Sequence, residues 1–133
     1  MDIVRYLDER RALLDQALSE RLPPKEEYPV SIHEALHYSL EGGKRVRPIL
    51  LLAACETVGG HLEDALTVAC GIELVHAFSL VHDDLPCLDN DATRRGRPTV
   101  HKQFGESIAL LTGDALLSLG FELLSKDGAS PRQ

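Results

Sequence analysis

The sequence predicts an all-helical protein, and two observations support this fold class. Apolar residues recur three or four positions apart along almost the whole chain, which is the spacing of one helix face. No segment shows the convincing alternation of apolar and polar residues that marks a half-buried strand. Short connectors with glycine or proline separate the helical stretches. We therefore expect one domain of about five helices across residues 1–133.

The first two helices follow from periodicity and from helix-ending residues. Residues 2–21 place their apolar side chains on one face, and the proline-rich segment 22–29 ends that pattern. Ser31 and Glu34 have the spacing of a capping box, which predicts that the second helix begins at Ser31. Gly42-Gly43 should end it, because glycine readily adopts the left-handed conformation that closes a helix.

Two further helices follow, and both are rich in apolar residues. Pro48 suits the first turn of a helix that should end at Gly59-Gly60, and its apolar residues on all sides predict full burial. The next helix is expected from Leu62 to Asp84, before Leu85-Pro86. Its predicted inner face consists of Ala65, Val68, Ala69, Ile72, Val75, His76, Ser79 and Leu80.

The last helix is expected from about Gly105 to Lys126, and residues 127–133 read as a loop. The N-terminus alternates charged with apolar residues, so we expect no signal peptide. No uninterrupted apolar run approaches 18 residues, so we expect no transmembrane helix.

Composition restricts the possible partners and the compartment. The net charge is −7, which argues against nonspecific nucleic-acid binding because that requires a basic surface. The three cysteines, Cys55, Cys70 and Cys87, include no C-x-x-C pair, and their odd number fits no complete disulfide framework. We interpret Cys55 and Cys70 as buried, reduced thiols, which favours an intracellular, cytoplasmic protein.

The stretch HDDLPCLDNDATRRGRP, residues 82–98, changes abruptly from acidic to basic. Asp83 and Asp84 fall on the last turn of an apolar helix, where the helix dipole and their mutual repulsion require an opposing cation. Together with Asp89 they offer the oxygen ligands that Mg²⁺ or Ca²⁺ prefers. The spacing does not match an EF-hand, and the adjacent arginines favour Mg²⁺ with a phosphorylated ligand. The alternative is a solvated acidic loop.

The stretch GGKRVRP, residues 42–48, is a second basic segment between two helices. Lys44, Arg45 and Arg47 precede the first-turn amides of a helix, which favours an anion site, although the spacing is not that of a P-loop. His76 lies two turns before Asp83 on the same helix face and becomes a candidate ligand-binding residue. A solvated connector and a hydrogen-bonded core histidine are the alternatives.

These segments, with ELVHAFSLVHDDLPCLDND and RRGRPTVHKQFGESIALLTGDALL, resemble the trans-isoprenyl diphosphate synthases, which include farnesyl and geranylgeranyl diphosphate synthases. The resemblance extends from about Pro29 to Leu124. It implies an all-α isoprenoid-synthase-type bundle and, usually, a homodimer. It also implies Mg²⁺-dependent head-to-tail condensation of an allylic diphosphate with isopentenyl diphosphate.

The resemblance further implies specific residue roles. Asp83, Asp84 and Asp89 match the first aspartate-rich motif, with Asp83 and Asp89 as direct Mg²⁺ ligands. Arg94 matches a contact to the allylic diphosphate. The residues that match the isopentenyl diphosphate site are Lys44, Arg47, His76 and Arg95.

Product length is expected to depend on Phe78 and Ser79, which stand five and four residues before the first aspartate. In this family that position controls chain length, and the Phe78 ring should close the product tunnel early and favour farnesyl diphosphate. Geranylgeranyl diphosphate is the alternative product. Phe78 and Phe104 also fit a plain core role.

The sequence departs from the family in two respects. Asp91-Ala92-Thr93 precedes Arg94 where a second acidic residue is usual, and that acid lies outside the expected ligands. Family members are also roughly twice as long, so the chain resembles an N-terminal half without the second aspartate-rich motif. We expect it to be inactive alone and to associate through its exposed half-core.

Two other classes of function are open at this point. One is a noncatalytic synthase-like subunit that pairs with a catalytic partner, although an intact aspartate motif argues against it. The other is a different helical Mg²⁺ enzyme, a terpene cyclase or a nucleotide pyrophosphohydrolase. A cyclase would not need Lys44, Arg47 and His76, and a pyrophosphohydrolase would show E-x-x-E pairs, none of which stands out.

Overall fold

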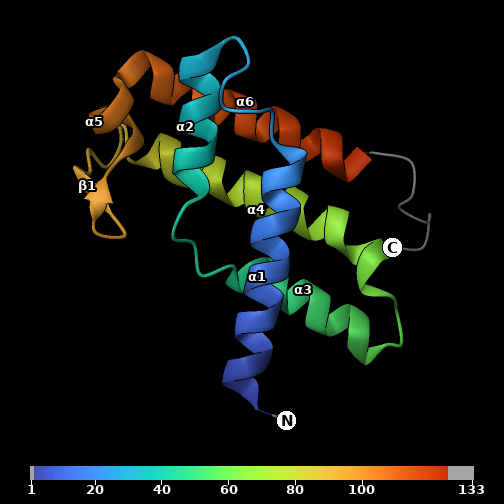
Figure 1. Cartoon of the computed structure of the whole chain (residues 1–133). Coiled ribbons are helices and arrows are strands. Elements are labelled where there is room, and N and C mark those ends of the chain that lie inside the picture. Colours follow the sequence, from blue (N-terminus) through green and yellow to red (C-terminus); the bar gives the residue numbers. More distant parts are fainter. Residues whose placement is uncertain (1, 126–133) are drawn as a thin grey trace.

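The computed structural model describes residues 2–125 and shows six helices around one core (Figure 1). The predicted loop over residues 127–133 lies outside the described residues. The helices are α1 (Ile3–Arg21), α2 (Val30–Leu40), α3 (Val46–Thr57), α4 (Leu62–Asp83), α5 (Val100–Phe104) and α6 (Glu106–Ser125). Strands β1 (Thr93–Arg94) and β2 (Arg97–Pro98) form a two-stranded antiparallel hairpin between α4 and α5. The all-α prediction is confirmed.

The packing of α4 against α6 forms the centre of the molecule (Figure 1). The two helices approach closely where Gly71 faces Gly120. A methyl group on Gly120 would lie 3.2 Å from the Gly71 carbonyl oxygen and 2.8 Å from Val75 Cγ2. Only a residue without a side chain permits this backbone approach.

The remaining long helices pack around this pair and complete the core. Each of the five long helices contributes one large, fully buried leucine. These residues are Leu14, Leu36, Leu52, Leu74 and Leu116. Burial of each such side chain contributes about 1.5–3 kcal/mol, and it helps to hold together helices that are far apart in sequence.

The start of α1 agrees with the sequence pattern, whereas the predicted capping box is wrong. The Asp2 carboxylate caps α1 and accepts hydrogen bonds from the backbone N–H groups of Val4 and Arg5. Helix α2 begins at Val30, one residue before the expected cap. Pro29 occupies the cap position, and its carbonyl accepts from Ile32 and His33. Pro29 has the extended conformation of a cap residue, but its ring offers no acceptor for a capping hydrogen bond.

Helix α3 is not buried on all sides, which corrects the sequence prediction. It packs on α4 and α1 with one face, while Val46 and Leu50 on the other face are more than half exposed. Apolar residues surround the whole circumference, so periodicity could not identify the exposed side.

The predicted inner face of α4 is also rotated from the observed one. Of the predicted residues only Ala65 and Ala69 are buried, and the others are half-buried. The buried stripe continues through Cys70, Gly71, Glu73, Leu74, Ala77 and Val81. The face that carries His76 therefore borders a cavity instead of the core.

The hairpin and α5 were not predicted, which explains the count of six helices instead of about five. Strands of two residues are too short to show alternation. Gly105, at φ +89°, separates α5 from α6, and glycine adopts this backbone conformation without a steric penalty.

Helices α4 and α6 are more apolar over their whole length than their short uninterrupted apolar runs suggest. By length and composition α4 and α6 could each cross a membrane, because each contains an 18-residue window with a mean hydropathy of 1.5. Core helices of soluble proteins share this composition, and α4 and α6 pack against each other (Figure 1). The similarity in composition is therefore weak evidence for a membrane span.

We predict that Gly120→Val lowers the free energy of unfolding by about 2 kcal/mol or more, because the added methyl groups force α4 and α6 apart. Urea denaturation followed by circular dichroism measures this change. Ser118→Val is the matched control, since Ser118 is exposed on the same helix. Equal stability of the two variants would contradict the close approach of α4 and α6.

Candidate functional site

The two basic segments identified in the sequence interlock in the structure. The hairpin places the Arg95 side chain over the turn formed by Gly42 and Gly43. A methyl group on Gly43 would lie 3.3 Å from Arg95 Nη1 and would collide with the Arg45 guanidinium. Gly42 has φ +73°, so the left-handed turn predicted for it is present. Glycine at position 43 thus leaves room for two arginine side chains.

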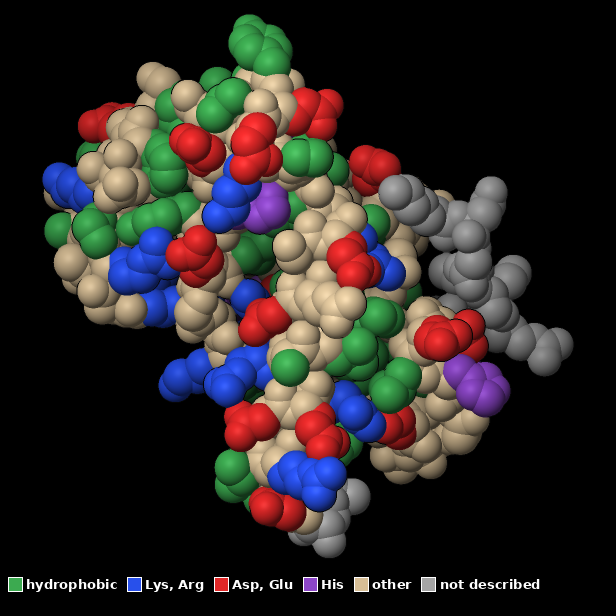
Figure 2. Space-filling view, viewed as in Figure 1, with side chains coloured by type: hydrophobic (Ala, Val, Ile, Leu, Met, Phe, Trp, Pro, Cys, Tyr) green, Lys and Arg blue, Asp and Glu red, His purple; other side chains and the backbone are tan. Residues whose placement is uncertain are grey.

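One pocket of about 360 Å³ lies beside this junction. All five residues predicted to bind substrate line it: Lys44, Arg47, His76, Arg94 and Arg95. They come from the α2–α3 turn, α3, α4 and the hairpin. Figure 2 shows Lys and Arg side chains gathered around the turn between α2 and α3. A protein of net charge −7 thus places several cationic side chains around this cavity, as an anion site requires.

Arg45 also belongs to the basic turn, but its charge is used inside the protein. The residue is 5% exposed and lies directly before α3 in the left-handed conformation. Nε donates to Asp15 Oδ1 at 2.8 Å, Nη1 donates to Glu73 Oε1 at 3.0 Å, and Nη2 donates to the Leu40 carbonyl. Arg45 therefore joins α1, the end of α2 and α4.

The role of Arg45 and Glu73 was missed from the sequence. The available signal was Glu73 itself, a charged residue within an apolar helix, because a buried carboxylate requires a cationic partner. Glu73 is 3% exposed, so the Arg45–Glu73 pair is removed from solvent. Loss of Arg45 would leave the Glu73 carboxylate as an uncompensated buried charge.

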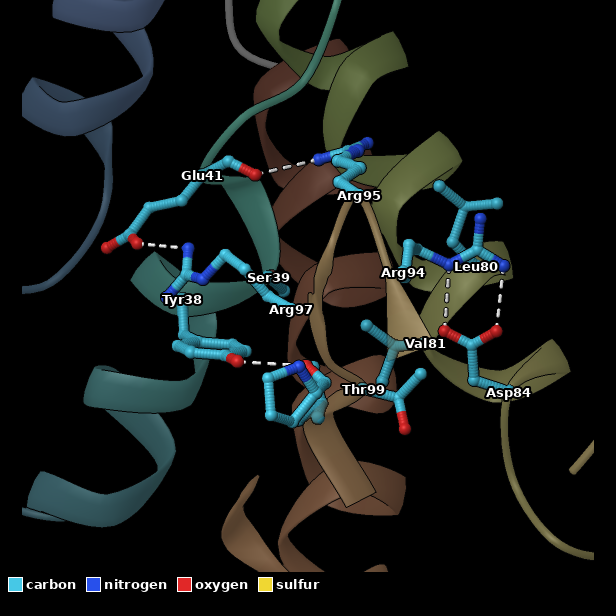
Figure 3. Close-up of a pocket in the computed structure, with 12 residues that line it drawn as sticks. Tyr38, Ser39, Glu41, Leu80, Val81, Asp84, Arg94, Arg95, Arg97 and Thr99 are labelled. Carbon is cyan, nitrogen blue, oxygen red and sulfur yellow. Dashed lines mark hydrogen bonds and ion pairs between the residues drawn. The ribbon is translucent and has the colours of Figure 1, made fainter. Parts of the chain in front are cut away.

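The aspartate cluster divides into one buried and two exposed carboxylates. Asp84 is 3% exposed, and its two oxygens accept from Arg94 Nε at 2.8 Å and Nη2 at 2.7 Å (Figure 3). Asp83 and Asp89 are exposed, and the Asp89 N–H donates to the Asp83 carbonyl at 2.8 Å. The chain thus folds back as the sequence suggested, with two carboxylates available to solvent.

The carboxylates alone do not complete a Mg²⁺ site. Within residues 2–125 no group of three metal-ligating side chains is close enough to hold an ion. Mg²⁺ commonly takes one or two protein carboxylates and completes its coordination with phosphate oxygens and water. Asp83 and Asp89 suit that arrangement, whereas Asp84 is engaged by Arg94.

Two residues that line the pocket have lowered pKa values. Burial and the nearby Arg47 lower the pKa of His76 below its usual value, and Arg47 Nη1 lies 3.4 Å from His76 Nε2. Burial and Arg45 lower the pKa of Arg95, although the guanidinium stays charged. The lowered pKa favours the neutral form of His76 in this arginine-rich cavity.

The two residues associated with product length occupy half-buried positions on α4. The Phe78 ring packs edge-on against His82, with 5.0 Å between the ring centroids. The Ser79 hydroxyl donates to the His76 carbonyl at 2.8 Å. Phe104 packs edge-on against Tyr38, which supports its core role. The influence of Phe78 and Ser79 on product length stays a prediction.

Comparison with known proteins identifies the family. The polyprenyl synthetase family model matches residues 29–132. The large subunit 1 of a chloroplastic heterodimeric geranylgeranyl pyrophosphate synthase from Arabidopsis thaliana is 53% identical over 135 residues, covering 98% of this chain and 36% of that protein. A chloroplastic geranylgeranyl pyrophosphate synthase from Capsicum annuum is also 53% identical, covering 95% of this chain and 34% of its own length.

A solved structure agrees with these relatives. The geranyltranstransferase of Thermotoga maritima superimposes with a TM-score of 0.84 at 42% identity, covering 91% of this chain and 45% of that one. The chain spans about a third of the length of the curated relatives described above. Its sequence, its helical fold and the positions of its motif residues lead to one conclusion: the chain belongs to the polyprenyl synthetase family.

Proposed function

We propose that this chain forms the part of a prenyl diphosphate chain-elongating enzyme that binds isopentenyl diphosphate and carries the first metal-binding aspartates. The observation that carries the proposal is the convergence of Lys44, Arg47, His76, Arg94 and Arg95 on one pocket. A diphosphate needs several cationic donors at short range, and arginine can bind its oxygens in a bidentate manner. The match to the polyprenyl synthetase family supports the same reaction class.

The proposed reaction would require one end of the site to hold a diphosphate and the other end to stabilise a diphosphate that leaves. Lys44, Arg47 and Arg95 would hold the diphosphate of isopentenyl diphosphate, while neutral His76 can donate or accept a hydrogen bond without adding charge. Arg94, oriented by Asp84, would stabilise the diphosphate that leaves the allylic substrate. Mg²⁺ held by Asp83 and Asp89 would supply further neutralisation of that leaving group.

Geranylgeranyl diphosphate is the product that the relatives favour. Both curated relatives described above carry that product in their names, whereas the farnesyl product expected from Phe78 is named for a similar solved structure, an FPP/GFPP synthase from Zymomonas mobilis. The half-buried Phe78 packs against His82 and the core, so its ring has a structural role as well. We therefore assign the 20-carbon product and retain Phe78 as a candidate length determinant.

The noncatalytic-subunit alternative is less well supported. One relative is named as the large subunit of a heterodimeric synthase, which makes a partner subunit conceivable for this chain too. Asp83 and Asp89 nevertheless keep exposed carboxylates beside an intact basic pocket. Subunits that only bind a partner have no need for these groups, so the catalytic assignment fits better. The homodimer and the cytoplasmic location expected from the sequence remain predictions.

A chimeric enzyme tests the proposed function directly. Residues 2–125 would replace the matching stretch of the Thermotoga maritima geranyltranstransferase, and product would be measured with labelled isopentenyl diphosphate, dimethylallyl diphosphate and Mg²⁺. We expect condensation, and we expect Asp83→Ala to reduce its rate about a hundredfold or more because leaving-group neutralisation is lost. Asp64→Ala, at the far end of α4, is the control. A folded chimera without elongated product would contradict the proposal.

Phe78→Ala in the same chimera should lengthen the product, because removal of the ring deepens the space beside α4. Chromatography of the dephosphorylated alcohols measures the chain length. Phe121→Ala is the matched control, since Phe121 is 60% exposed. If Phe78→Ala and the parent chimera gave the same product, the length determinant would lie elsewhere.

His76 offers a test of pocket occupancy in the chain itself. Burial and Arg47 lower the pKa of His76 in the folded chain, so the fold favours the neutral imidazole. This contribution to the free energy of unfolding is fully present above the unfolded pKa of about 6.5 and is lost as pH falls through the lower folded pKa. Bound inorganic pyrophosphate should raise the pKa of His76, because an anion offsets the field of the arginines. Histidine NMR titration with and without pyrophosphate measures this shift. An unchanged His76 pKa at saturating pyrophosphate would place the anion outside the pocket.

A further inference from the structure

Arg97, the third arginine of the RRGRP segment, does not line the basic pocket. It lines the neighbouring pocket drawn in Figure 3, and it makes different contacts. Its guanidinium stacks over the Tyr38 ring, 4.0 Å from the ring centroid, and Nη1 donates to the Glu41 carboxylate. Tyr38 belongs to α2, and Glu41 directly follows that helix. Figure 3 shows Arg97 between the hairpin and the end of α2. We call Tyr38, Glu41 and Arg97 the Arg97 clamp.

The Arg97 clamp is fixed at its base by the surrounding structure. The Tyr38 hydroxyl donates to the Pro98 carbonyl at 2.8 Å, so the same aromatic residue binds both the side chain and the backbone of β2. The Tyr38 ring also contacts Phe104 edge-on at a centroid distance of 5.3 Å. Tyr38 therefore cannot move without disturbing α5 as well as the hairpin.

The hairpin tip, which carries Arg95, lies next to the Arg97 clamp in the chain. Arg95 and Gly96 both have positive φ, 53° and 73°, the geometry of a tight two-residue hairpin turn. Such a conformation is unfavourable for arginine and persists only where neighbouring contacts hold it. Arg95 Nη1 donates to the Glu41 carbonyl at 3.0 Å, at the C-terminal end of α2, where the helix dipole favours a cation.

The two sides of the hairpin are thus fastened to different helices. On one side Arg94 is held by Asp84 at the end of α4, and on the other Arg97 is held by Tyr38 and Glu41 at the end of α2 (Figure 3). Glu41 contacts two arginines of the hairpin, because its carboxylate accepts from Arg97 and its carbonyl accepts from Arg95. Glu41 thus links the Arg97 clamp to the side chain of Arg95.

We propose that Tyr38, Glu41 and Arg97 are positioning residues that hold Arg95 in its diphosphate-binding orientation. This inference rests on the proposed function of the pocket. The side chains of Arg97 and Glu41 are 39% and 47% exposed, and ion pairs this accessible to water contribute little to global stability. Their removal should therefore alter ligand binding more than folding, which distinguishes positioning from a general structural role.

The test measures binding and hairpin opening separately in the chain of 133 residues. Isothermal titration calorimetry with inorganic pyrophosphate and with isopentenyl diphosphate gives affinities for the parent chain, Arg97→Gln and Tyr38→Leu. Arg5→Gln is the matched control for loss of one positive charge, because Arg5 is exposed and pairs with Glu9 on α1. Tyr38→Phe keeps the stacked ring and removes only the hydroxyl.

We expect Arg97→Gln and Tyr38→Leu to weaken binding about fivefold, since each removes the stacking contact, and Arg5→Gln to change it less than about twofold. Tyr38→Phe should retain most of the affinity. A double-mutant cycle of Arg95 and Arg97 distinguishes positioning of Arg95 from a general structural role of Arg97. If Arg97 acts through Arg95, then Arg97→Gln has no further effect in an Arg95→Gln background.

Limited trypsin digestion reports on the hairpin without any ligand. Trypsin cleaves after Arg94 and Arg95 but not before Pro98, so substitution of Arg97 changes no cleavage site. We expect faster cleavage at Arg94 and Arg95 in Arg97→Gln, with cleavage elsewhere unchanged, as mass spectrometry of the fragments would show.

The two measurements separate this inference from the function on which it rests. If the parent chain bound neither probe, the proposed function would fail, while the digestion result would still decide whether the Arg97 clamp holds the hairpin. If the parent bound both probes and Arg97→Gln bound them as well as Arg5→Gln does, the positioning role would be overturned. Additive effects of Arg95→Gln and Arg97→Gln would overturn it as well.

Discussion

The arrangement of the site depends on one buried charge. Arg45 is almost completely buried, and a buried guanidinium needs acceptors for its hydrogen bonds. It finds them on Asp15, Glu73 and the Leu40 carbonyl, which belong to three different helices. A buried ion pair is weak evidence for added stability, but it is demanding in geometry. Arg45 therefore fixes where the basic turn meets α4, and the flanking Lys44 and Arg47 are placed at the pocket as a result.

Backbone strain is concentrated in the same segments. Among the described residues, the non-glycine residues with positive φ are Arg45, Asn90 and Arg95. One precedes α3 in the basic turn, one follows the aspartates, and one forms the hairpin tip. Such conformations persist where surrounding contacts compensate for them, and they are common at functional sites. Their location agrees with an assignment of function that was reached from charge and geometry.

At two places in the site, a charged residue that is paired inside the protein stands close in sequence to one that is available to a ligand. Asp84 is buried and holds Arg94, while Asp83 on the preceding position is exposed. Arg45 binds Glu73 inside the protein, while Arg47 two residues later lines the pocket. Adjacent residues on a helix or turn point in different directions, so consecutive charges can serve separate purposes. This separation explains how a run of arginines can combine structural pairing with ligand binding.

The sequence by itself determined the helical class and most helix boundaries, and it named five of the residues that line the pocket. Helical period and glycine-bearing turns are local properties, and the chemistry of paired aspartates and clustered arginines is visible in the residue types. The sequence could not determine which face of α3 or α4 is buried, because both helices are apolar on nearly all sides and only their neighbours distinguish one face from another.

Only the tertiary structure decided how the charges are paired. Glu41 and Arg97 are 56 residues apart, and Arg45 and Glu73 are 28 apart, so no local pattern could predict their contacts. The same limit applies to Asp84, whose residue type suits a metal ligand but whose burial against Arg94 gives it another partner. Side-chain chemistry identifies what a residue can bind, whereas the packing of helices distant in sequence determines what it does bind.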